Sequence, residues 1–163
     1  MERKILLLGD PKLYEASVPV GREEDLSQLK QDLHDTLMAF RRTYHAGRAI
    51  AAPQIGVQKR VLYMYIDKPV LFLNPVLRFP DEEMMEVLDD CMSFPTLYVR
   101  VLRHKRCIID YFDETWQPHS LPLEDDLSEL LQHEYDHLDG ILATMRAVDH
   151  KSLYLEQMKR DFS

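Results

Sequence analysis

The chain has 163 residues, of which 45% are hydrophobic and 29% are charged, and its formal net charge is −8. This composition is typical of a globular protein, and the length predicts one domain over residues 1–163. The acidic balance argues against nucleic-acid binding, because a phosphate backbone repels an acidic surface. The apolar runs are too short for a membrane span or a signal peptide, so we expect a cytoplasmic protein. Two cysteines, Cys91 and Cys107, are too few for a disulfide framework and are expected as thiols.

The first two thirds of the chain predict one long helix followed by strands. Leu26, Leu29, Leu33 and Leu37 recur at three- and four-residue steps, which predicts an amphipathic helix that ends at Gly47. Short apolar segments rich in β-forming residues predict four strands. These segments are 60–66, 70–77, 97–102 and 105–112.

The last third predicts a second helix. Residues 113–122 are rich in turn-forming residues and are expected to be a connection. Residues 123–140 predict a helix with acidic residues in its first turn and Gly140 at its end. The tail, residues 151–163, is expected to form a short helix. A long N-terminal helix, several antiparallel strands and a second helix indicate an α+β fold.

The second predicted helix carries a pattern that is typical of metal sites. His133 and His137 are four residues apart, so they share one face of a helix, and Glu134 directly follows the first histidine. The apolar residues on this helix indicate that the histidines lie close to a buried side. Because buried imidazoles need partners, a bound metal ion is favoured over a solvated helix face.

Two histidines do not complete a metal site, and the third ligand distinguishes between classes of protein. A third histidine at the metzincin spacing is excluded, because that position is Ala143. Cys91 lies in an apparently turn-like segment between strands, where a thiolate would complete three ligands and leave one position for water. Glu156 in the tail is the alternative ligand, while Cys107 fits a buried structural thiol better.

Three segments, in order along the chain, resemble the motifs of the peptide deformylase family. They are GRAIAAPQIG (47–56), DDCMS (89–93) and QHEYDHLDG (132–140). Together they make the resemblance specific, and it extends over nearly the whole chain. It implies antiparallel sheets wrapped around a central metal-binding helix that carries the HExxH pattern. It also implies an enzyme that removes the formyl group from the N-terminal formyl-methionine of nascent peptides and releases formate, acting near the ribosome exit region.

The resemblance assigns roles to individual residues. Cys91, His133 and His137 would hold one divalent metal ion, with Fe²⁺ as the expected metal and Zn²⁺, Ni²⁺ or Co²⁺ as alternatives, since this ligand set suits several borderline ions. Such an ion would activate a water molecule, and Glu134 would act as the general acid and base.

The same resemblance implies which groups stabilise the oxyanion formed when water attacks the formamide. They would be the side-chain amide of Gln54 and the backbone N–H of Met92.

The chain departs from the family on the side that the resemblance assigns to the substrate. Ala49 replaces a glycine, Arg48 replaces a small apolar residue, and an Asp89-Asp90 pair replaces Glu-Gly. Asp126 and Glu129 occupy helix positions that the family fills with apolar residues. The expected substrate-binding residues are Gly47, Arg48, Ala49, Asp89, Asp126 and Glu129.

These charges predict an altered substrate preference, in which a polar or basic first residue competes with methionine, and Arg48 could pair with Glu129 across the pocket. Two alternatives remain open at this point. One is a deformylase-like metalloprotein with weak or no deformylase activity, and the other is a zinc peptidase that uses Glu156.

Overall fold

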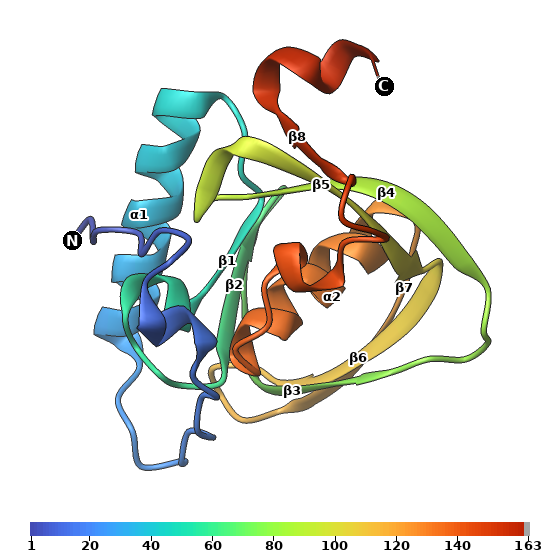
Figure 1. The fold of residues 1–163 in the computed structure, drawn as a ribbon. Helices are drawn as coiled ribbons and strands as arrows, with labels where there is room; N and C mark the ends of the chain where they lie inside the picture. The colour runs from blue at the N-terminus through green and yellow to red at the C-terminus, as the bar shows by residue number, and fades with distance from the viewer. Residues whose placement is uncertain (162–163) are drawn as a thin grey trace.

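The computed structural model describes residues 1–161, which form two α-helices and eight strands in two antiparallel sheets (Figure 1). The helices are α1 (Ser27–Tyr44) and α2 (Asp126–Leu138). The first sheet has the order β1 (Ala49–Ala51), β2 (Val61–Tyr65), β3 (Pro69–Arg78), β6 (Arg106–Phe112) and β7 (Pro118–Glu124). The second has the order β4 (Met84–Cys91), β5 (Phe94–His104) and β8 (Leu153–Leu155). Neither helix of the described chain has the length and apolarity that a membrane crossing requires.

Helix α2 lies between the two sheets, and α1 covers the opposite face of the five-stranded sheet (Figure 1). The alternation of side chains along β2 explains this arrangement, because successive residues of a strand face opposite sides. Val61 and Tyr63 are buried in a cluster with leucines of α1, whereas Leu62 is buried in a cluster with Leu131 and Leu138 of α2. The five-stranded sheet therefore has a hydrophobic core on each face.

The three-stranded sheet closes the other side of α2. Val99 and Val101 of β5 are fully buried in a third cluster, together with Leu142 after α2 and with Cys91. Contacts from α2 to β1 and to β5 tie the helix to both sheets. Side chains on α2 can thus meet residues from the ends of β1 and β4.

The predicted helices are present with shorter bounds. The helix expected to end at Gly47 ends at Tyr44, and His45 follows in the left-handed conformation with φ 56°. Gly47 has φ 116° and lies in the connection to β1. The helix predicted over 123–140 begins at Asp126, and Gly140, two residues after its end, has φ 72°.

Each of the four predicted strands matches a strand, but four other strands, β1, β4, β7 and β8, were not predicted. The prediction of a connection over 113–122 is wrong in its second half, where β7 begins at Pro118. The turn-like segment expected around Cys91 is present as a two-residue turn, Met92–Ser93, between β4 and β5, but Cys91 itself is the last residue of β4. The helix predicted for the tail is wrong at 153–155, which form β8, and a short 3₁₀ helix follows at Glu156–Asp161. Residues 162–163 of that prediction lie outside the described residues.

Candidate metal centre

Three buried side chains from two different elements bring their donor atoms together. The sulfur of Cys91, at the end of β4, and one ring nitrogen each of His133 and His137, on α2, all lie within 4.8 Å of one another. Cys91 Sγ is 3.3 Å from His137 Nε2. Two donors on one tetrahedral metal ion, at bond lengths of about 2.0–2.3 Å, are separated by roughly 3.5 Å.

The chemistry of these donors also fits a divalent transition metal. Burial and the neighbouring His133 lower the pKa of His137 well below its usual value, which keeps this imidazole neutral, the form that binds metals. Its Nδ1 is buried without a hydrogen-bond partner in residues 1–161. Cys91 Sγ accepts hydrogen bonds from the backbone N–H of Ser93, at 3.4 Å, and from Gln54 Nε2, at 3.6 Å, which hold the sulfur in position. The three residues could therefore hold a metal ion.

A buried chain of charges orients His133. Asp89 Oδ2 lies 3.0 Å from His133 Nδ1, so the other ring nitrogen is left to face the cluster. Arg103, only 3% exposed, donates to Asp89 at 2.8 Å and to Asp136 at 2.6 Å. Asp136 also accepts two hydrogen bonds from Arg146. Although burial alone would raise the pKa of Asp89, the charges of His133 and Arg103 lower it to about 2.

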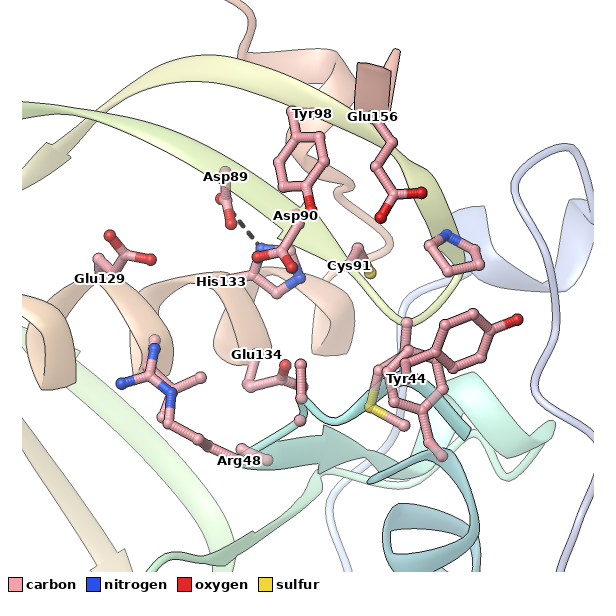
Figure 2. Close-up of a pocket in the computed structure, with 17 residues that line it drawn as sticks. Tyr44, Arg48, Asp89, Asp90, Cys91, Tyr98, Glu129, His133, Glu134 and Glu156 are labelled. Carbon is pink, nitrogen blue, oxygen red and sulfur yellow. Dashed lines mark hydrogen bonds and ion pairs between the residues drawn. The ribbon is translucent and has the colours of Figure 1, made fainter. Parts of the chain in front are cut away.

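Glu134 has the properties of a group that exchanges protons near neutral pH. It is 4% exposed, and burial raises the pKa of its carboxyl to about 7. One carboxylate oxygen, Oε2, has no hydrogen-bond partner in the described part of the chain. Figure 2 shows this carboxylate below His133, between Arg48 and Tyr44. A buried carboxyl of this kind suits a general acid and base.

Gln54 lies where its amide can face the same cluster. It is fully buried in the 3₁₀ helix Ala52–Ile55, and its Oε1 accepts a hydrogen bond from the backbone N–H of Ala51. This contact fixes the amide so that Nε2 points toward Cys91 and donates to Ser93 Oγ at 3.2 Å. Met92, the other residue expected at the oxyanion, follows Cys91 and lines the cavity beside it.

A cavity of about 260 Å³ opens beside the cluster and contains most of the predicted substrate-binding residues. Its walls include Gly47, Arg48, Ala49, Asp89 and Glu129, together with Cys91, His133 and Glu134. Figure 2 shows Arg48 and Glu129 on one side of His133 and Tyr44 and Glu156 on the other.

The structure places two of these side chains differently from what was expected. Asp126 is not one of the described residues that line the cavity, and its side chain is 75% exposed. Arg48 forms its ion pair with Asp126, at 3.2 Å, and not with Glu129. The reason is their position on α2, since Asp126 is in its first turn and beside the loop that carries Arg48.

Sequence reasoning missed several residues of the site. Arg103 lies just beyond the strand predicted over 97–102, although it follows the buried Val99 and Val101 at two-residue steps and so belongs to the buried face of β5. Tyr44, Pro95 and Tyr98 line the cavity without any pattern that singles them out. Glu156, the alternative ligand, lines the cavity but is not in the donor cluster.

Known proteins with similar sequences and structures identify the family of this chain. The family model described as polypeptide deformylase matches residues 2–152. Peptide deformylases of Pseudothermotoga lettingae and Erythrobacter litoralis are 37% and 34% identical, over 87% and 96% of this chain and 81% and 92% of theirs. The crystal structure of a peptide deformylase from Legionella pneumophila has a TM-score of 0.83 and 31% identity, covering 99% of this chain and 92% of that one. The chain therefore belongs to the peptide deformylase family.

Proposed function

We propose that the chain is a metal-dependent enzyme that hydrolyses the formamide at the N-terminus of formylated nascent peptides and releases formate. Membership of the peptide deformylase family supports the reaction class. The observation that carries the assignment of the site is the buried group of Cys91, His133 and His137 beside the unpartnered carboxylate of Glu134, in one cavity.

In this proposal Cys91, His133 and His137 hold one divalent metal ion per chain. The native ion is Fe²⁺, and Zn²⁺, Ni²⁺ or Co²⁺ can replace it, because a Cys-His-His set suits all of these borderline ions. When bound, the ion supplies Lewis-acid activation of water and of the formyl oxygen. Asp89 keeps His133 in the ligating orientation through its contact with Nδ1.

The side chain of Glu134 moves the proton. Oε2 accepts a proton from the attacking water and then delivers it to the nitrogen of the departing amine, so that the peptide leaves with a free N-terminus. A pKa of about 7 allows both transfers near neutral pH. Gln54 Nε2 and the backbone N–H of Met92 donate to the oxygen on which negative charge develops.

The remaining parts of the proposal concern the setting of the reaction. Residues 1–163 act as one domain, in which both sheets are needed to enclose α2. The substrate is met as a nascent peptide near the ribosome exit region, in the cytoplasm.

The test is a formate-release assay on metal-analysed protein that has been purified without oxygen. We expect Glu134→Gln to keep its metal and to lose turnover by a factor of roughly a hundred or more, because it keeps the shape of the side chain but cannot accept the proton. Glu82→Gln, an exposed residue between β3 and β4, is the matched control and should leave turnover unchanged. Normal turnover in Glu134→Gln would remove the proposed role, and no formate from any formyl-peptide would remove the proposed function.

A further inference from the structure

One end of the active-site cavity contains a carboxyl group, that of Glu129, for which the described part of the chain provides no hydrogen-bond or ion-pair partner. Glu129 lies one helical turn before His133 on α2, and it lines the cavity while being half-buried. The neighbouring cation, Arg48, is already paired with Asp126 at 3.2 Å. Because Arg48 already has this partner, Glu129 is the group at this end with which a cationic ligand could pair.

The position of Glu129 matches the reach of the first side chain of a bound peptide. Four residues of α-helix span about 6 Å, which is close to the length of an extended lysine side chain. If the formyl carbon lies at the donor cluster, the first residue begins beside His133, and its side chain can run along α2 toward Glu129.

The shape of the cavity favours this direction for the side chain. On the other side of His133 lie Tyr44 and Glu156, both exposed, whereas Glu129 and Leu130 are half-buried (Figure 2). A side chain ends after a few atoms and can occupy the more enclosed end. The rest of the peptide continues for many residues and needs the open end.

We propose that Glu129 selects a cationic first residue, so that the enzyme prefers formyl-lysyl and formyl-arginyl peptides to formyl-methionyl peptides; this rests on the proposed deformylase function. A methionine side chain at this end desolvates a carboxylate without giving it a partner, which is unfavourable. An ammonium or guanidinium group gives Glu129 a charge-assisted hydrogen bond, while the aliphatic part of the side chain packs on Leu130.

Burial supports this interpretation. It raises the pKa of Glu129 to about 7, with the charge of Asp89 acting in the same direction and that of Arg48 acting against it, so a cationic side chain bound beside Glu129 would favour the ionised carboxylate.

The experiment compares kcat/KM for formyl-peptides that differ only in their first residue: lysine, Nε-acetyl-lysine, norleucine, methionine and glutamate. For the unaltered enzyme we expect kcat/KM for the lysine peptide to exceed that for the acetyl-lysine and norleucine peptides by at least about tenfold. Norleucine has the aliphatic part of lysine without its ammonium group, and acetyl-lysine keeps the nitrogen in a neutral form. Glu129→Gln should remove most of this preference, so that the ratio of kcat/KM for the lysine peptide to kcat/KM for the norleucine peptide falls toward one. Glu129→Lys should reverse the preference, so that kcat/KM for the glutamate peptide exceeds kcat/KM for the lysine peptide. Glu82→Gln should keep the preference of the unaltered enzyme.

The outcomes separate the two proposals. Formate release with methionine preferred, or with equal rates for lysine and acetyl-lysine, would overturn the assignment of Glu129 and leave the deformylase function standing. A lysine preference that survives in Glu129→Gln would also overturn it. Absence of formate from every peptide would overturn both. Poor folding of a variant cannot imitate the expected result, because it would lower the rates on charged and neutral peptides equally.

Discussion

Removing the guanidinium of Arg103 should destabilise the protein more than removing any exposed charge. Arg103→Met keeps most of the aliphatic length of the side chain but leaves Asp89 and Asp136, both buried, without the cation between them. Breaking a buried ion pair by deleting one partner costs about 3–5 kcal/mol, because the remaining charge stays desolvated. That is a large part of the stability of a typical domain, which is about 5–15 kcal/mol.

Arg146→Met is the matched control, since Arg146 contacts the same Asp136 with a side chain that is 44% exposed. We expect Arg146→Met to lower the free energy of unfolding by no more than about 1 kcal/mol. Urea unfolding of both metal-free variants measures the difference in free energy of unfolding. If Arg103→Met does not fold, a triple variant that adds Asp89→Asn and Asp136→Asn should fold again. It no longer contains the two buried carboxylates that had lost their cation.

Arg103→Met should also weaken metal binding. Asp89 contacts both Arg103 and His133, and it would lose the contact with Arg103 that helps to hold it against His133. Loss of such a supporting contact typically lowers metal affinity about 10- to 100-fold. Competition with a chelator measures this. Equal losses of stability in Arg103→Met and Arg146→Met, or unchanged metal affinity in both, would refute the structural role of Arg103.

Three further predictions test other parts of the molecule. Cys91→Ala should lose most of the bound metal in elemental analysis, whereas Cys107→Ala should keep it; full occupancy in Cys91→Ala would contradict the ligand assignment. Burial raises the pKa of Tyr63 to about 12, so the folded state keeps a proton that the unfolded state loses from about pH 10. Stability should therefore fall as the pH rises from 10 toward 12, and thermal melts of Tyr63→Phe should show a shallower fall. Gly140→Ala should cost about 2–4 kcal/mol, because φ is 72° and the added Cβ would lie 2.5 Å from the carbonyl oxygen of Tyr14. Gly56→Ala, with a φ of 81° and no atom within 4 Å, should cost only the backbone strain, and equal losses in denaturant titrations would contradict the steric argument.

The parts of the fold that the sequence predicts are those with strong side-chain patterns. Strands β2, β3, β5 and β6 are apolar enough to be recognised, and both helices have regular leucine spacing. Strand β7 has no such pattern, because it is an edge strand with two prolines and only Leu123 buried. Its backbone pairing with β6 holds it in place, and this pairing leaves no trace in a hydropathy pattern.

The candidate site was predictable to a similar extent. The donor residues stand in motifs with fixed spacing, so His133 and Cys91 could be named from the sequence. The ion-pair partner of Arg48 could not be predicted from the sequence. Asp126 and Glu129, both on α2, are within reach of its long side chain, and only the direction of each side chain decides between them. Tyr98 and Glu156 come to the cavity through the pairing of β5 with β8, which joins segments more than 50 residues apart.

The order of strands in the five-stranded sheet has a consequence for how the protein folds. Strands β3 and β6 pair with each other although all of β4 and β5 lies between them in the chain, so this ladder closes a long loop. Pairings of this kind slow folding, since the entropy of loop closure is lost before the contacts form. Helix α2 has only 13 residues, which is marginal for a helix alone in water. The spacing of the two histidines therefore depends on the packing of α2 between the sheets, so the metal-binding face is a product of the tertiary structure and not of the helix alone.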